Sequence, residues 1–287
     1  MGKYQKPKKK LHREFAYLNY DSIVNALSAF EAGQVDSIIE KTSEASDGGV
    51  SGGLKVGPAK ADASKKKKSS VQEELVRTRT RFSAFDAWLS TLEGQDAIGE
   101  FDVWDMTVRD DLEIGDLIRF AADLRLSPVH KLFAAYASFA SSTTNGNIFQ
   151  VSGSQAAEIK KTARMMETWI SGRDGTRSYP AYFCPNGTDM PRIIGRLTDS
   201  WLISGLDSIE ERYTVIGQVR SKLEGSDRES VIRLLRNAPA FDKEIETVKE
   251  AMQHFIEPGE ELGVPVDEQD LTFRNPDVIL HPIAIFK

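Results

Sequence analysis

The nine residues before the C-terminal Lys287 constrain the fold most strongly. From Val278 to Phe286 the chain is apolar on both faces of an extended strand, with His281 and Pro282 as interruptions. An apolar run of this length is typical of a buried strand. Because Pro282 has no N–H to donate to a sheet, it needs an edge position or a bulge.

Period-two alternation predicts a half-buried strand over 116–126. Its apolar face carries Ile118, Phe120, Ala122, Leu124 and Leu126, and its polar face carries Arg119, Asp123 and Arg125. Such alternation places successive side chains on opposite faces of a sheet. Further strands are predicted at 15–20, around 101–105, at 192–203 and at 212–223, with the last two paired to each other.

Helical spacing of apolar residues predicts several amphipathic helices. The strongest covers 71–93, where one stripe carries Leu75, Phe82, Phe85, Leu89 and Leu92 with Trp88 at its edge. Others are predicted after caps at Asp21 or Ser22, Ser127, Ser154 and Asp242. The fold class is therefore predicted to be α+β, an irregular mix of antiparallel strands and amphipathic helices.

Residues 46–70 differ from the rest because they contain five glycines, one proline and almost no large apolar groups. Such a segment buries too little surface to offset its ordering entropy, so a disordered Gly/Lys-rich internal loop is predicted. The predicted organisation in chain order is a basic tail at 1–12, an N-terminal α+β domain at 13–172 that includes this loop, a connection at 173–191 and a C-terminal α+β subdomain at 192–287.

The formal net charge of −6 conceals an uneven distribution. Residues 1–14 and 46–70 together hold twelve basic and three acidic side chains, which leaves −15 for the remainder. An acidic body repels nucleic acid and anionic membranes, so contact with either is expected to use the basic segments. The contact residues predicted on this basis are Lys8, Lys9, Lys10, Lys65, Lys66, Lys67 and Lys68.

Tests for catalytic and metal-binding patterns are negative. The glycines of 48–53 lack the Gly-Lys-Ser/Thr ending of a phosphate-binding loop, and no Gly-x-Ser-x-Gly elbow is present. Cys184 has no neighbouring base in the sequence, and the four histidines are widely separated, so no cofactor and no metal site are predicted. The acidic string from Asp102 to Glu113 is predicted to be a surface loop.

The opening Glu14-Phe15-Ala16-Tyr17-Leu18, the Gly/Ser/Lys-rich insertion and the ending Pro282-Ile283-Ala284-Ile285-Phe286 carry a family resemblance. The chain resembles an uncharacterised family of bacterial proteins that contain a domain of unknown function. The resemblance implies a bacterial, cytoplasmic protein and supplies no activity and no catalytic residues.

Three functions stay open at this point. The absence of catalytic patterns favours a non-enzymatic protein-interaction protein that binds a partner or itself, for example a subunit of a bacterial assembly such as a phage-defence system. An electrostatic binder of nucleic acid or anionic membrane is the first alternative, and an enzyme with an unrecognised site is the second. The lack of an apolar run of about 18–20 residues predicts that no segment spans a membrane.

Overall fold

The structure of the protein is a computed structural model. The predicted basic tail at 1–12 and the predicted loop at 46–70 lie outside the residues that it describes. The described residues are 13–30, 81–144, 157, 159–164, 175–186, 191–236, 250 and 263–287. The chain divides into two compact units, one formed by Met1–Leu18 with Ile98–Lys287 and the other by Asn19–Ala97.

In the smaller unit, helices occupy residues 20–30 and α3 (Arg81–Gly94). The cap of the first lies at least two residues earlier than predicted, because the side-chain oxygen of Asn19, rather than Asp21 or Ser22, accepts the backbone N–H of Ser22 at 3.1 Å and caps the helix. In α3 the predicted stripe is buried at Phe85, Leu89 and Leu92. The prediction is wrong for Phe82, which is 48% exposed. Trp88 is buried in its place, because it lies three residues from Phe85 and four from Leu92.

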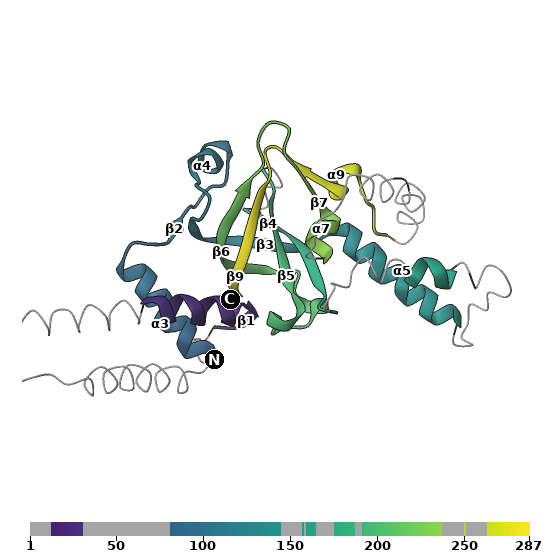
Figure 1. Cartoon of the computed structure of the whole chain (residues 1–287), viewed down its shortest axis with the longest axis horizontal. Coiled ribbons are helices and arrows are strands. Elements are labelled where there is room, and N and C mark those ends of the chain that lie inside the picture. The colour runs from purple at the N-terminus through teal and green to yellow at the C-terminus, as the bar shows by residue number, and fades with distance from the viewer. Residues whose placement is uncertain are drawn as a thin grey trace, which may run out of the picture. The chain divides into compact units, whose positions relative to one another are not determined.

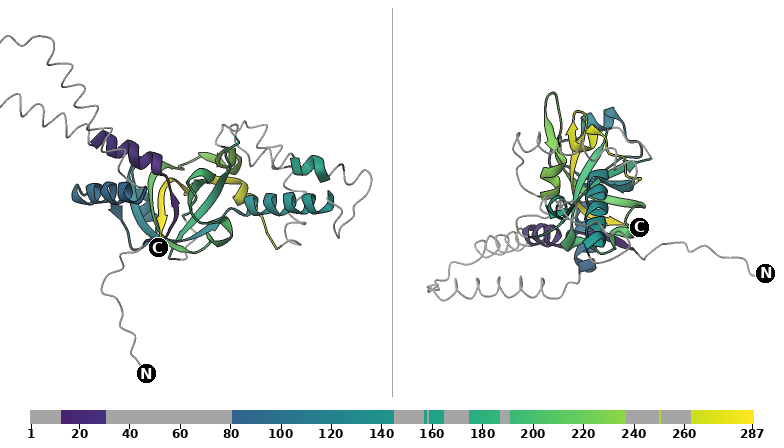
Figure 2. Two further views of the ribbon diagram at one scale, coloured as in Figure 1. Left: turned by 90° about the horizontal axis from the view of Figure 1, so that it is seen from below. Right: turned by 90° about the vertical axis from the view of Figure 1, so that its right-hand side faces the viewer.

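Five strands of the larger unit pair in a closed cycle and form a barrel, whose curved strands can be followed in Figures 1 and 2. They are β3 (Leu117–Leu126), β4 (Ser178–Pro185), β5 (Ile193–Thr198), β6 (Arg212–Lys222) and β9 (Val278–Phe286). β3 pairs with β4, β4 with β5, β5 with β9, β9 with β6, and β6 with β3. Two shorter strands extend this sheet, since β1 (Phe15–Leu18) pairs with the end of β9 and β2 (Gly99–Glu100) with the start of β3.

The barrel interior confirms the period-two prediction for 116–126. The inward side chains of β3 belong to one buried apolar cluster with side chains from every other barrel strand, among them Phe183, Ile193, Val215 and Leu280. Pro282 lies in β9 between the residues paired with β5 and those paired with β1, next to a register shift in the β6–β9 pair. The predicted bulge is thus present, and it accommodates the missing N–H.

A second apolar cluster covers part of the outer barrel surface. Its members come from α5 (Pro128–Thr144), α7 (Val231–Arg236), α9 (Glu268–Leu271) and β8 (Thr272–Arg274), and they pack on Ile194 of β5 and Ile279 of β9. β8 pairs with β7 (Arg228–Ser230) in a separate two-stranded sheet. Since β5 and β9 carry buried apolar residues on both faces, the predicted buried C-terminal strand is confirmed.

Short helices pack near the ends of the barrel strands. The strand predicted around 101–105 is wrong, because the Asp105 side chain accepts the Val108 N–H at 3.0 Å and caps α4 (Met106–Asp111). The Trp104 indole N–H donates to the Pro191 carbonyl at 2.6 Å, and its ring joins the barrel core. Two single-turn helices, η1 (Asp199–Trp201) and η2 (Leu206–Ser208), connect β5 to β6.

The order of pairing defines the topology of the barrel. Counted along the chain, the first barrel strand (β3) pairs with the second and the fourth, and the third (β5) lies parallel to the fifth (β9). This is the strand order of the OB-fold, a five-stranded Greek-key barrel. α5 lies in the connection between the first and second strands, and β7, α7, α9 and β8 lie between the fourth and fifth.

Two sequence-based expectations differ from this topology. The predicted pairing of 192–203 with 212–223 is wrong, because β5 and β6 each pair with β9 and not with each other. The predicted connection at 173–191 contains β4, which is hydrogen-bonded to strands on both sides. Its prolines and turn residues resemble a loop in the sequence, but the strand is buried on both faces.

Candidate functional site

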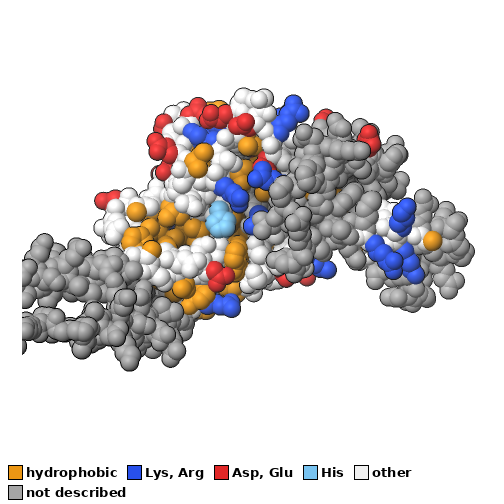
Figure 3. Space-filling view, in the orientation of Figure 1, with side chains coloured by type: hydrophobic (Ala, Val, Ile, Leu, Met, Phe, Trp, Pro, Cys, Tyr) orange, Lys and Arg blue, Asp and Glu red, His pale blue; other side chains and the backbone are white. Residues whose placement is uncertain are grey.

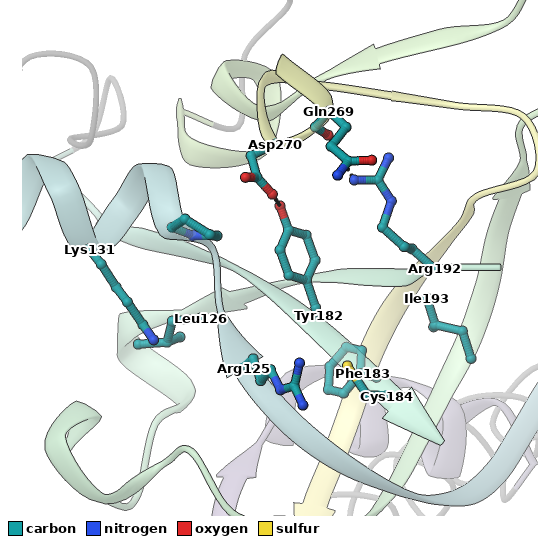
Figure 4. A pocket seen from close by; sticks show the side chains of 11 residues that line it. Arg125, Leu126, Lys131, Tyr182, Phe183, Cys184, Arg192, Ile193, Gln269 and Asp270 are labelled. Carbon is teal, nitrogen blue, oxygen red and sulfur yellow. Dashed lines mark hydrogen bonds between the residues drawn. The ribbon is translucent and has the colours of Figure 1, made fainter. Parts of the chain in front are cut away.

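The pocket with the clearest structural context lies on the outer face of β4 and β5 (Figure 4). It has a volume of about 340 Å³, which falls within the range of small-ligand sites. We call it the strand-face pocket. Its principal polar side chains are Arg125, Lys131, Tyr182, Arg192, Gln269 and Asp270.

Local structure directs these side chains outward. Phe183 of β4 points into the barrel core, so the neighbouring Tyr182 and Cys184 point to the outer face. Arg125 precedes the inward Leu126 of β3 in the same way. Lys131 comes from the first turn of α5, which Ser127-Pro128 begins as predicted from the sequence.

Tyr182 connects the barrel strand to α9 across the pocket. Its hydroxyl lies 3.1 Å from an Asp270 carboxylate oxygen, toward which the ring points in Figure 4. Burial and the Asp270 charge both raise the pKa of Tyr182, so the phenol stays protonated and donates this hydrogen bond. The ring also meets Phe273 edge-on, with centroids 6.1 Å apart.

Arg192 fixes the opposite wall of the pocket. Its Nε and Nη2 donate to the two carboxylate oxygens of Asp277 at 3.0 and 2.5 Å, and its Nη1 donates to the Gln269 carbonyl at 2.7 Å. Burial acts to lower the pKa of Arg192, but the hydrogen bond and charge of Asp277 outweigh it and raise the pKa. Arg192 is therefore a permanent, oriented positive charge.

The other two cations of the strand-face pocket are more accessible. Lys131 donates to a Glu210 carboxylate oxygen at 2.8 Å, and both side chains of this pair are exposed to solvent. Arg125 lies on the exposed face of β3. The lining thus holds three basic side chains and one acidic side chain, Asp270, whose oxygen already accepts the Tyr182 hydroxyl.

The residues that sequence reasoning considered for chemistry are dispersed. Cys184 is buried in β4 and contributes to the pocket lining. His130 is buried in the first turn of α5, where burial and the charges of Arg177 and Lys131 lower its pKa to about 4. His281 is half-buried in β9, where burial, Arg196 and Arg220 lower its pKa. Both imidazoles are therefore neutral at pH 7.

The acidic string from Asp102 to Glu113 has structural roles. Asp105 caps α4, and Asp110 accepts a hydrogen bond from Arg109 at 2.8 Å. In the part of the chain that the structure describes, no three His, Cys, Asp or Glu side chains are placed to hold a metal ion. The predicted contact residues Lys8, Lys9, Lys10, Lys65, Lys66, Lys67 and Lys68 lie outside the described residues.

Sequence reasoning missed most of the strand-face pocket. It assigned Arg125 to the polar face of its strand, and the structure confirms that orientation. Arg192 and Tyr182 lie in or beside a stretch predicted to be a connection, and Asp270 lies almost ninety residues beyond its tyrosine partner. In the sequence, Tyr182 and Arg192 are marked only by lying next to apolar residues that point into the barrel. That alternation can be recognised only once β4 and β5 are known to be barrel strands.

Comparisons with known proteins identify a family without assigning an activity. No curated protein and no solved structure matches the chain. Residues 12–286 match the model of a domain of unknown function, DUF6414. This match covers nearly the whole sequence and confirms the expected membership of an uncharacterised family: the chain belongs to the DUF6414 family.

Proposed function

We propose that this protein is a non-enzymatic binder of single-stranded nucleic acid and that the strand-face pocket is its structured contact site. The observation that carries the proposal is the meeting of three basic side chains in one pocket on the outer face of the barrel: Arg125 of β3, Lys131 of α5 and Arg192, which directly precedes β5. OB-folds bind oligonucleotides and oligosaccharides on the face of their second and third strands, flanked by the two connections that contain α5 and α9 in this chain.

The chemistry of the lining must support this analogy, because a fold alone does not specify a function. An oligosaccharide site would need carboxylate or amide acceptors for hydroxyl groups. This lining has one of each, Asp270 and Gln269, against three basic side chains, which favours an anionic ligand. Guanidinium groups suit phosphate, and a tyrosine ring can contact a base or a sugar. A volume of about 340 Å³ admits one nucleotide unit but not a duplex.

The basic segments complement the pocket in this proposal. Lys8–Lys10 and Lys65–Lys68 supply positive charge to a chain whose remaining part is acidic. Lysine clusters attract phosphates without regard to sequence and increase the rate of association. The pocket would then position the strand, and the segments would raise the affinity.

Fluorescence anisotropy with labelled single-stranded DNA and RNA of about 12 nucleotides tests the pocket, since OB-fold sites span about 4–16 nucleotides. The variant Arg125→Ala/Lys131→Ala should bind at least about tenfold more weakly, and its plot of log affinity against log salt should flatten by about 1.4 for two lost phosphate contacts. The matched control Arg212→Ala removes an exposed arginine of β6 that pairs with Asp123. Unchanged affinity and slope in the double variant would refute the pocket as the site.

A second full-length variant tests the contribution of the segments. Replacing the seven lysines by glutamine should reduce affinity similarly for all sequences and reduce the salt slope by up to about 5. Binding that is lost only in this variant would assign the function to the segments alone. Vesicles containing an anionic phospholipid serve as a comparison and should bind more weakly than the oligonucleotide.

Protein binding is a second candidate function, favoured by apolar side chains beside α4. Val103, Met106 and Ile114 are 62%, 46% and 69% exposed within one short segment. Exposed apolar groups so close in sequence are a feature of partner surfaces. Light scattering over a concentration series would detect self-association, which Met106→Lys should weaken.

Bacterial origin, a cytoplasmic location and a role in phage defence stay predictions from the sequence.

A further inference from the structure

A second hollow on the barrel is lined mainly by arginine. It has a volume of about 540 Å³ and shares no residue with the strand-face pocket. We call it the arginine hollow. Its basic residues are Arg196, Arg220, Arg228 and Arg233, and its apolar residues are Leu223, Leu234 and Ile279.

The two strands that flank β9 place two of these arginines within electrostatic reach of each other. Arg196 extends from β5 and Arg220 from β6, and β9 pairs with both of these strands. His281 of β9 lies between them, since Leu280 pairs with Gly195 on one side and His281 with Gln218 on the other. Figure 3 shows Lys and Arg side chains next to a histidine on this face of the molecule. Arg228 and Arg233 reach the hollow from β7 and α7.

The acidic residues of the hollow, Asp227 and Glu229, neutralise only part of its positive charge. Glu229 pairs with Arg233, four residues later in the chain, at 2.9 Å. A carboxylate oxygen of Asp227 accepts the backbone N–H of Glu224 at 3.3 Å, within a turn. Among the described residues, Arg196, Arg220 and Arg228 have no side-chain hydrogen bond and no ion pair. Glu229 therefore neutralises Arg233, whereas the charges of Arg196, Arg220 and Arg228 are not neutralised by direct contact with the described residues.

This arrangement is electrostatically unfavourable in the free protein. Burial, and then the nearby charge of Arg220, lower the pKa of Arg196. Elsewhere the barrel pairs its buried arginines: Arg109 donates to Asp110, to the Leu223 carbonyl and to the Pro276 carbonyl. A half-buried arginine beside a second arginine, without a carboxylate contact, is the arrangement expected where an anion binds.

We propose that the arginine hollow binds a phosphate group of a nucleotide-sized ligand. Guanidinium groups present paired N–H donors that match phosphate oxygens, and two of them approaching from the strands on either side of β9 can neutralise a dianion. The apolar residues offer a surface for an uncharged part of the ligand, and a volume of about 540 Å³ is sufficient for a mononucleotide. The phosphate could belong to a free nucleotide or to the backbone of an oligonucleotide, and this site does not rest on the strand-face pocket.

Thermal unfolding of the full-length protein tests the proposal at constant ionic strength. Inorganic phosphate, a nucleoside triphosphate and a single-stranded oligonucleotide are each compared with chloride. A ligand at a hundred times its Kd should raise Tm by about 5–10 °C. The variant Arg196→Gln/Arg220→Gln should lose this shift, whereas Arg212→Gln, which removes an exposed arginine of β6, should keep it.

The unliganded variants give a second readout. Because Arg196 and Arg220 repel each other, Arg220→Gln and the double variant should melt at or above the wild-type temperature. A large fall in the Tm of both would show that the arginines are structural and would overturn the proposal. It would also be overturned if no phosphate compound raises Tm above chloride, or if the double variant keeps the full shift with inorganic phosphate or the triphosphate.

The ligands and variants distinguish the source of the phosphate. A shift with phosphate or triphosphate identifies a free phosphate compound. A shift with the oligonucleotide alone that Arg196→Gln/Arg220→Gln loses and Arg125→Ala/Lys131→Ala keeps identifies backbone phosphate at the arginine hollow. Arg125→Ala/Lys131→Ala should keep the phosphate shift, because those residues line only the strand-face pocket. Oligonucleotide binding at that pocket can therefore fail while the arginine hollow still binds phosphate.

Discussion

Gly195 and Gly217 lie where the barrel strands leave no room for a side chain. A β-carbon on Gly195 would come within 2.6 Å of the Phe183 ring and 2.8 Å of the Pro282 ring. One on Gly217 would come within 2.7 Å of Leu280 and 3.0 Å of the His281 carbonyl oxygen. The close approach of strands around the small barrel thus depends on these two glycines.

Gly195→Ala should destabilise the protein by about 1–3 kcal/mol, as overpacking of a filled core does. Gly205→Ala is the matched control, because nothing lies within 4 Å of its added β-carbon and its φ of −64° suits alanine. Urea denaturation measures both. Equal midpoints for the two variants would contradict the close packing at Gly195.

A second single residue, His130, makes the free energy of unfolding depend on pH. Its Nδ1 is buried without a hydrogen-bond partner among the described residues, and burial is the main cause that lowers its pKa to about 4. The unfolded chain therefore takes up a proton near pH 6.5 that the folded protein takes up only near pH 4.

Above pH 6.5 the contribution of His130 to the free energy of unfolding should stay constant. As the pH decreases from 6.5 toward 4, the free energy of unfolding should fall by up to about 3 kcal/mol. Urea unfolding at pH 7.5 and pH 5 measures the effect, and His130→Gln is the comparison because glutamine does not titrate. If the variant loses as much stability between these pH values as the wild type, His130 is not the cause.

At the scale of elements, α3 shows which part of a helix stripe is core. Phe85 and Phe82 have the same chemistry and lie one turn apart, but Phe85 is fully buried and Phe82 is 48% exposed. Helical spacing alone assigned both to the buried face. Their different burial follows from the extent of the surface that covers the helix, which spacing does not encode.

Phe85→Ala should cost about 3–5 kcal/mol, and Phe82→Ala less than about 1 kcal/mol. Chemical denaturation of both variants provides an internally matched comparison, since each removes the same side chain from the same helix. Similar losses in the two variants would mean that Phe82 is as important to the core as Phe85.

At the scale of the whole molecule, one ion pair links segments that are distant in the sequence. Arg192 directly precedes β5, Asp277 directly precedes β9, and the two side chains form an ion pair in which Asp277 is 1% exposed. The same carboxylate accepts the Arg274 N–H at 3.0 Å, and Arg192 also reaches the Gln269 carbonyl. The pair therefore holds the fourth-to-fifth connection against the barrel.

Arg192→Gln should destabilise the protein by about 3–5 kcal/mol, because it leaves Asp277 buried without its charged partner. Arg212→Gln, which breaks an exposed pair with Asp123, should cost less than about 1 kcal/mol. Thermal and urea unfolding measure both changes. A small effect of Arg192→Gln would show that solvent compensates Asp277.

Local patterns in the sequence were sufficient to predict the elements whose apolar residues follow a single helical or strand period, or whose ends carry a clear cap. Alternation in 116–126 predicted β3 and its two faces, the apolar ending predicted β9, and Ser127-Pro128 predicted the start of α5. These predictions hold because strand and helix periods are properties of neighbouring residues. The same reasoning failed for 178–185, where both strand faces are buried and no alternation remains.

The tertiary structure decided what depends on partners far apart in the chain. Whether β5 pairs with β6 or with β9 is set by closure of the barrel, in which residues 193–195 meet residues 278–280. The candidate sites follow from that closure, since Arg192 with Asp270 and Arg196 with Arg220 become neighbours only through it. A sequence specifies each side chain and its local period, whereas the convergence of charges on one surface arises from long-range strand pairing.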